Sequence, residues 1–264
     1  MCYDISARPP LPPIAGGAGM GETRELVLEA GDGNQFAAYS ATTASPGGPG
    51  IVVMPDVRGL YRFYKELAER FAEAGVHATA IDYFGRSAGV AERDGDFDYM
   101  PHVAETLPET IAADVAAAVA HLRSTEGGGA EAVFTVGFCF GGRNSFNQAA
   151  AGHGLAGVIG FYGFVARRDD DDKSAPVDLA KDYRSPVLGL FGGADQHILP
   201  EHVAGFRAAL DSAGVGNDVV TYDGAPHSFF DRTAREHADA SADAWRRMLK
   251  FIQTNRTGGA PAPS

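Results

Sequence analysis

The stretch at residues 132–142 reads AVFTVGFCFGG, an apolar run that ends in a cysteine between glycines. It follows the nucleophile-elbow pattern G-x-S-x-G, with Cys139 in the place of the serine. Gly137 and Gly141 leave the space that this sharp strand-to-helix turn needs, because larger side chains there would collide. The positive end of the helix dipole would favour a thiolate at this position. The pattern therefore predicts that Cys139 is a nucleophile at the end of a buried strand.

Two later strands supply the partners that such a nucleophile needs. The run PVLGLFGGAD at 186–195 ends in Asp195, and the strand and turn NDVVTYDGAPH at 217–227 deliver His227. In α/β-hydrolases the order along the chain is nucleophile, acid, histidine. His227 would take the thiol proton and return a proton to the leaving group, while Asp195 would orient the imidazole. The sequence predicts the triad Cys139, Asp195 and His227.

Other residues compete for two of these roles. Asp223 is a second candidate for the acid, but it lies on the same loop as His227, whereas hydrolase triads take the acid from an earlier strand. His197 and His202 are near Asp195 but do not fit the expected order along the chain. For the oxyanion, the backbone N–H of Phe140 and one from the loop after Met54-Pro55 are the candidates.

The rest of the chain alternates apolar runs with helical patterns, which favours a mostly parallel twisted sheet with helices on both faces and ligands at the carboxyl ends of the strands. The expected strands are 23–29, 35–40, 50–54, 76–81, 133–138, 157–162, 187–192 and 217–222, and the expected helices are 64–74, 111–122, 143–151, 200–213 and 232–253. Residues 83–108 are expected to form an irregular loop beside the site, with Arg86, Tyr99 and His102 on it. For Tyr99 and His102 we expect a packing or rim role.

Length and charge narrow the class of protein. The 264 residues suit one α/β domain at 22–254, preceded by an extended arm at 1–21 and followed by a disordered tail at 255–264. A net charge of −12 argues against nucleic acid and anionic membranes as partners. With only Cys2 and Cys139, a disulfide framework is not expected, and this favours a reducing cytoplasm.

No targeting segment or cofactor motif is indicated. The first residues lack a basic stretch followed by an apolar one, and no apolar run approaches membrane-spanning length. No His/Cys/Asp/Glu cluster has metal-ligand spacing, and no G-x-G-x-x-G motif opens a helix after the first strand, so we expect neither a metal nor a dinucleotide.

Three motifs together carry a resemblance. With GFCFGG at 137–142, GGAD at 192–195 and APHSF at 225–229, the chain resembles the dienelactone hydrolase family, a cysteine-dependent branch of the α/β-hydrolases. The spacing matches over roughly residues 22 to 254. The resemblance implies hydrolysis of cyclic enol-lactones such as dienelactone, or of other esters, through an acyl-enzyme on Cys139.

The resemblance also implies roles for residues outside the triad. Asp56 takes the place of an acidic residue, usually glutamate, that contacts the resting thiol, and the N–H of Val57 joins the oxyanion hole. Arg86, and Arg232 after the histidine, correspond to arginines that bind a substrate carboxylate. Two other functions stay open: a broad carboxylesterase or thioesterase, and a non-catalytic thiol redox sensor, for which Cys2 is the other cysteine.

Overall fold

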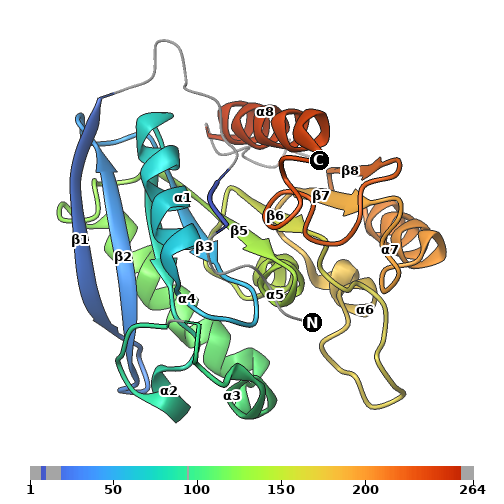
Figure 1. The fold of residues 1–264 in the computed structure, drawn as a ribbon, viewed down its shortest axis with the longest axis horizontal. Coiled ribbons are helices and arrows are strands. Elements are labelled where there is room, and N and C mark those ends of the chain that lie inside the picture. The colour runs from blue at the N-terminus through green and yellow to red at the C-terminus, as the bar shows by residue number, and fades with distance from the viewer. Residues whose placement is uncertain (1–6, 10–18, 94, 257–264) are drawn as a thin grey trace.

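A single mixed sheet organises the protein, and the computed structural model describes residues 7–9, 19–93 and 95–256 of it. The strand order is β1-β2-β4-β3-β5-β6-β7-β8; β1 and β2 run antiparallel to their neighbours, and the pairs from β4 to β8 are parallel (Figure 1). The strands are β1 (Met20–Glu29), β2 (Gln35–Thr43), β3 (Pro49–Met54), β4 (His77–Ile81), β5 (Ala132–Phe138), β6 (Gly157–Phe161), β7 (Val187–Gly192) and β8 (Asn217–Tyr222). This confirms the predicted mostly parallel sheet.

Helices cover both faces of this sheet, as the sequence predicted. On one face α1 meets α8 through Phe71 and Trp245, whose rings are 5.0 Å apart. On the other, α5 meets α7 through Phe146 and Phe206, also 5.0 Å apart, and α4 lies behind the strands in Figure 1. The helices are α1 (Arg62–Glu73), α2 (Gly85–Ala88), α3 (Tyr99–Glu105), α4 (Pro108–Arg123), α5 (Phe140–Asn147), η1 (Gln148–Ala150), α6 (Pro176–Leu179), η2 (Ala180–Asp182), α7 (Pro200–Ser212) and α8 (Ala238–Asn255).

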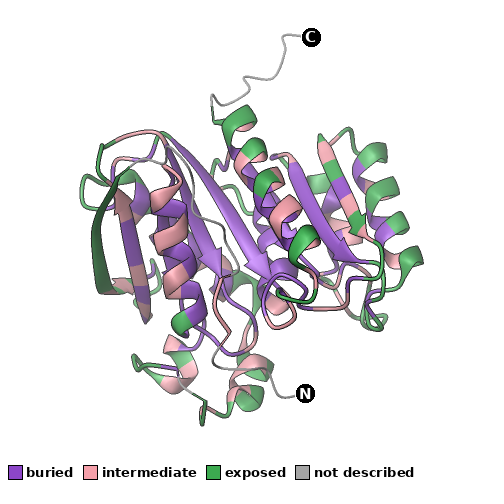
Figure 2. Ribbon diagram, turned by 45° about the horizontal axis from the view of Figure 1, so that its top comes forward, coloured by how far each residue is buried: buried purple, intermediate pink, exposed green. Residues whose placement is uncertain are grey.

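The five central strands form the core. Every residue of β3, β4, β5, β6 and β7 is buried, whereas at the edges β1 is largely exposed and β8 is partly exposed (Figure 2). Strands covered on both faces have no solvent side, so their sequences are continuous apolar runs and not alternating ones. Because the strands from β5 to β8 are parallel, the carboxyl ends of β5, β7 and β8 lie at the same edge of the sheet.

Four helices begin elsewhere than the sequence predicted. Those expected at 64–74 and 111–122 begin at Arg62 and Pro108. The helix expected at 143–151 begins at Phe140, immediately after the nucleophile, because the elbow reverses the chain within one residue. The helix expected at 232–253 begins only at Ala238, since residues 228–237 form a series of turns that bury Phe229 and Phe230. The loop expected at 83–108 contains two short helices, α2 and α3.

The ends of the predicted domain are only partly described. Most of the predicted arm, residues 1–6 and 10–18, and residues 257–264 of the predicted tail lie outside the described residues, and so does Cys2. Strand β1 begins at Met20, two residues before the predicted domain boundary. Among the helices of the described ranges, none has the length and apolar character to cross a membrane.

Candidate active site

Cys139 lies on a strained turn between β5 and α5. Its backbone has φ 55° and ψ −111°, a positive φ that side-chain-bearing residues rarely adopt. The turn is held by a hydrogen bond from the Cys139 N–H to the carbonyl of Phe161 at 3.0 Å, and by one from the Arg143 N–H to the Cys139 carbonyl at 3.2 Å. A nucleophile held in this way points its thiol away from the sheet, into the space beyond the strand ends.

The glycines around Cys139 are required by close backbone contacts. A Cβ on Gly137 would lie 1.9 Å from the carbonyl oxygen of Gly141, and a Cβ on Gly141 would lie 2.2 Å from the carbonyl oxygens of both Met54 and Pro55. No side chain could be added at either position without moving the backbone. These contacts explain the G-x-C-x-G spacing and place the start of α5 directly against the loop after β3.

Asp195 and His227 meet at the carboxyl ends of β7 and β8. The Nδ1 of His227 is 2.6 Å from Oδ2 of Asp195, and Oδ1 of Asp195 accepts hydrogen bonds from the N–H groups of His197 at 2.9 Å and Ile198 at 3.2 Å. The Asp195 side chain is 1% exposed and that of His227 is 21% exposed. The Asp195 carboxylate is therefore held in place by hydrogen bonds and shielded from water, while the His227 imidazole is partly exposed to solvent.

His227 also forms a hydrogen bond with the side chain of Cys139. Burial by itself would lower the pKa of His227, but the hydrogen bonds and charges of Asp195 and Cys139 outweigh it and raise that pKa to about 10. For Asp195, burial would raise the pKa, but the bond to His227 lowers it overall. The three side chains thus form a continuous chain of hydrogen bonds that favours a charged imidazolium next to the thiol.

A cavity of about 410 Å³ opens above these side chains. It has an apolar wall of aromatic and aliphatic groups and three arginines. The lining residues are Val57, Met100, Val103, Cys139, Phe140, Arg143, Tyr162, Phe164, Arg168, His197, Ile198, His227, Ser228 and Arg232. A cavity of this size suits a small molecule with an apolar body.

Residues 36–255 match the family model described as "Dienelactone hydrolase family". The chain belongs to the dienelactone hydrolase family. A relative from Salmonella typhimurium, named "Putative carboxymethylenebutenolidase", is 32% identical over 82% of this chain and 81% of its own length. A relative of the same name from Yersinia pestis is 28% identical over 88% of each chain.

Solved structures agree with this membership. A crystal structure from Klebsiella pneumoniae, named "Putative Dienelactone Hydrolase", superposes with a TM-score of 0.78 at 26% identity and covers 89% of this chain and 99% of its own. The fold is therefore the α/β-hydrolase fold, as the sequence predicted. As a member of the dienelactone hydrolase family, the protein is a hydrolase of esters or lactones.

Of the acids considered for the triad, Asp195 is the one that contacts His227. Asp223 is exposed on the turn after β8. His197 lines the cavity with its ring 6.3 Å from that of His227, and His202 accepts a hydrogen bond from the N–H of Leu199 at 3.2 Å. The structure thus brings Cys139, His227 and Asp195 together, and their roles as nucleophile, base and acid stay a prediction.

Asp56 is buried, but its carboxylate faces a partner that the sequence did not suggest. Nε of Arg58 lies 2.9 Å from Oδ1 and 3.1 Å from Oδ2 of Asp56, and Nη2 also contacts Oδ2. The contact between Asp56 and the thiol, implied by the dienelactone hydrolase family, stays a prediction. Val57 lies beside Asp56 and lines the cavity, as does Phe140 across from it.

The two arginines expected to bind a carboxylate have different positions. Arg232 lines the cavity. The structure does not bring Arg86 there: its Nη1 lies 2.7 Å from Oδ2 of Asp32 and its Nη2 lies 2.9 Å from Oδ1 of Asp114. Arg86 ties α2 to the β1–β2 hairpin and to α4, because two carboxylates on these elements face it.

The sequence missed two arginines of the cavity. Arg143 lies one helical turn after Cys139 on α5, a spacing that places both on one face and could have revealed it. Its guanidinium is 2.7 Å from Oδ2 of Asp172 and donates to the carbonyls of Phe164 and Ala166, so it holds the loop that carries Arg168. Arg168 lies on this irregular loop, and no sequence pattern distinguishes it from other exposed arginines.

Neither Tyr99 nor His102, for which a packing or rim role was expected, is among the residues that line the cavity. Nδ1 of His102 is 2.9 Å from Oγ of Ser87, and its ring stacks on Phe97 at 5.2 Å. Tyr99 is half-buried at the start of α3, the helix that also presents Met100 and Val103 to the cavity.

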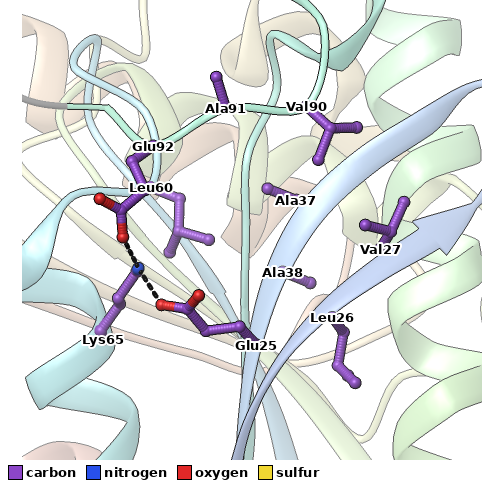
Figure 3. Close-up of a pocket in the computed structure, with 10 residues that line it drawn as sticks. All are labelled: Glu25, Leu26, Val27, Ala37, Ala38, Leu60, Lys65, Val90, Ala91 and Glu92. Atoms are coloured by element: carbon purple, nitrogen blue, oxygen red, sulfur yellow. Dashed lines mark hydrogen bonds and ion pairs between the residues drawn. The ribbon is translucent and has the colours of Figure 1, made fainter.

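A second hollow, of about 230 Å³, lies away from these residues (Figure 3). It is bordered by β1, β2 and residues 90–92, and Lys65 holds Glu25 at 2.7 Å and Glu92 at 3.4 Å across it. No predicted site residue lines this hollow.

Proposed function

We propose that the protein hydrolyses small esters or lactones through an acyl-enzyme on Cys139. The observation that carries the proposal is the position of His227, which bonds both Asp195 and Cys139 at the floor of the cavity. The sulfur attacks the carbonyl carbon while His227 holds the thiol proton, and the C–O bond to the leaving group then breaks as His227 returns that proton to the leaving oxygen. A water molecule next attacks the thioester carbonyl carbon while His227 takes one of its protons. The C–S bond then breaks, the carboxylic acid leaves, and His227 returns the proton to the sulfur.

The backbone N–H groups of Val57 and Phe140 are the proposed oxyanion hole. Phe140 is the first residue of α5, so the helix itself has no acceptor for its N–H. The Gly141 contacts with the Met54 and Pro55 carbonyls bring this helix start against the loop that carries Val57. Val57 and Phe140 both line the cavity beside Cys139, so their N–H groups are the proposed donors to one carbonyl oxygen, a contribution that is typically about 100- to 1,000-fold in rate per donor. A reducing cytoplasm, which keeps the thiol unoxidised, fits this chemistry.

A panel of substrates tests the proposal. Wild type and Cys139→Ala are assayed with p-nitrophenyl esters, thioesters and unsaturated lactones. We expect turnover of esters or lactones that is lost in the variant. Turnover that the variant retains would rule out the acyl-enzyme, and equal turnover of neutral esters and thioesters without lactones would favour the broad esterase.

The arginines of the cavity predict a preference for anionic substrates. Arg168 is exposed and makes no ion pair with any described residue, and Arg232 shares the same cavity. Arg168→Ala is expected to raise KM for carboxylate-bearing lactones by about tenfold, a modest change because the contact is exposed to solvent. KM for neutral esters should stay within about twofold.

Arg167 is the matched control for this substitution. It is the neighbouring arginine, is paired with Asp178 at 2.6 Å, and does not line the cavity, so Arg167→Ala should leave KM for both substrates unchanged. Equal effects of Arg168→Ala on charged and neutral substrates would show that Arg168 does not bind a carboxylate.

A further inference from the structure

A buried cluster of charges lies between two loops of the active site. Arg58 belongs to the loop after β3, and Asp231 belongs to the turn after His227. The side chains of Arg58, Asp56 and Asp231 are 8%, 3% and 2% exposed. Three buried charges of this kind need a reason, because each loses its hydration when the protein folds.

Arg58 contacts both carboxylates at once. It holds Asp56 through both carboxylate oxygens, and its backbone N–H donates to Oδ1 of Asp56 at 2.9 Å. Its Nη2 lies 2.6 Å from Oδ2 of Asp231, which also accepts a hydrogen bond from the Tyr61 hydroxyl at 3.2 Å. The guanidinium carbon is 3.9 Å from the centre of the Tyr61 ring, which fixes its plane.

The two loops that Arg58 joins carry opposite sides of the proposed reaction centre. Val57, whose N–H is a proposed oxyanion donor, lies between Asp56 and Arg58 in sequence. On the other loop, the Asp231 N–H donates to the carbonyl of Ser228 at 3.1 Å, and Ser228, next to His227, has a positive φ of 61°. Because this hydrogen-bonded turn is short, a shift of Asp231 would also shift His227.

We propose that Arg58 is a positioning residue that ties the Val57 loop to the His227 loop by bridging Asp56 and Asp231. The inference rests on the proposed function, because it assigns the bridge a role in aligning the oxyanion donor with the histidine. A misplacement of about 1 Å at a reacting centre can lower the rate about 100-fold, so a bridge of this kind has a large effect on kcat.

The ionisation of Asp231 makes it possible to distinguish a positioning role for the Asp231–Arg58 contact from a role in protein stability. Burial raises the pKa of Asp231 to about 6; Arg58 opposes the shift, the charge of Asp56 adds to it, and the hydroxyl of Tyr61 opposes it. Tyr64, whose hydroxyl accepts a hydrogen bond from the Asp56 N–H, is the other titratable neighbour. A carboxyl whose pKa is raised from 3.8 to about 6 contributes stability below pH 3.8 that is lost as the pH rises through about 6.

At pH 8 the ionised Asp231 therefore costs stability, and the Asp231→Asn variant should unfold at the same temperature as wild type or a higher one. Its catalysis should suffer, because the amide cannot hold Arg58 by charge. In wild type, protonation of Asp231 below about pH 6 weakens the same contact, so kcat should fall on the acid side with an apparent pKa near 6.

The experiment compares Asp231→Asn with Asp231→Glu and Asp114→Asn in kcat, KM, unfolding temperature and pH profile. Asp231→Glu restores a carboxylate and should recover part of kcat. Asp114 is the matched control, since it is also buried, also paired with an arginine and also has a pKa raised by burial to about 6, but it lies on α4 and not on either of the loops that carry Val57 and His227. Asp114→Asn should leave the acid side of the kcat profile unchanged.

For Asp231→Asn we expect kcat at pH 8 to fall about 10- to 100-fold with KM within about twofold and no drop in unfolding temperature. The step near pH 6 should also disappear. A kcat within twofold of wild type, or a loss of kcat that follows a lower unfolding temperature, would overturn the proposal. Because the wild-type profile needs no variant, its flatness between pH 5 and 7.5 would overturn the proposal even if Asp231→Asn failed to fold.

Trapping of the acyl-enzyme distinguishes failure of this inference from failure of the proposed function. With a slow ester, Asp231→Asn should still form an adduct on Cys139, only more slowly than wild type. If wild type forms none, the proposed function is wrong; if both form it at the same rate, only the positioning role is wrong.

Discussion

Replacement of Cys139 by alanine is expected to lower kcat for esters and lactones by about 10⁴-fold or more, because the sulfur that forms the acyl bond is gone. The fold should be retained. The backbone of the elbow is held by the hydrogen bond to Phe161 and by the contacts of Gly137 and Gly141, none of which involves the thiol. Steady-state rates and thermal unfolding of both proteins measure the two effects.

The adduct itself is the more direct measurement. After wild type is mixed with a slowly hydrolysed ester, intact mass should increase by the acyl group, and peptide mapping should place the increase on Cys139. Cys2→Ser is the matched control, since it removes the other cysteine of the chain and should leave the adduct and kcat unchanged. An adduct that survives in Cys139→Ala, or full activity of that variant, contradicts the mechanism.

A hydroxyl should not replace the thiol well. Cys139→Ser is expected to retain little of the wild-type kcat, because the far less acidic hydroxyl gives up its proton less readily to His227. Rates close to wild type would mean that the site activates its nucleophile by deprotonation at the moment of attack, as serine hydrolases do, and not through a preformed ion pair.

The parts of the site that the sequence predicted are those fixed by local backbone geometry. Gly137 and Gly141 mark the elbow because a Cβ at either position would overlap a carbonyl oxygen, and this constraint leaves a visible pattern. The positions of Asp195 and His227 follow from the same logic, since each lies on the turn after a parallel strand and parallel strands bring their carboxyl ends to one edge.

The parts that the sequence did not predict depend on which long side chains meet across the fold. Arg86 matches a family pattern, yet its guanidinium forms ion pairs with Asp32 and Asp114 and does not line the cavity. Asp56 lies where the pattern places it, but the arginine two residues on turns back to bind it. An arginine side chain reaches several partners from one backbone position, so its partner is decided by tertiary contacts that spacing does not encode.

Asp195→Asn is expected to lower kcat by roughly 10²- to 10⁴-fold while the protein stays folded. The carboxylate accepts the Nδ1–H of His227 and so leaves Nε2 able to receive the thiol proton, whereas an amide that presents its NH₂ to Nδ1 favours the other tautomer. Asn can still accept the hydrogen bonds from the His197 and Ile198 N–H groups, so the turn after β7 should keep its shape. Loss of the charge should also lower the pKa of His227 from about 10, because Asp195 contributes to that shift.

Asp223→Asn is the matched control, because this second aspartate lies on the turn after the neighbouring strand β8 but is exposed and has no part in the hydrogen-bond chain from Asp195 through His227 to Cys139. Its kcat should stay within about twofold of wild type, as is usual for an exposed residue without a partner in the site. Measuring kcat and the NMR titration of the His227 ring in both variants tests the assignment. If Asp223→Asn lost the activity and Asp195→Asn kept it, the acid of the triad would be Asp223, and the His227 loop would have to turn away from β7 during the reaction.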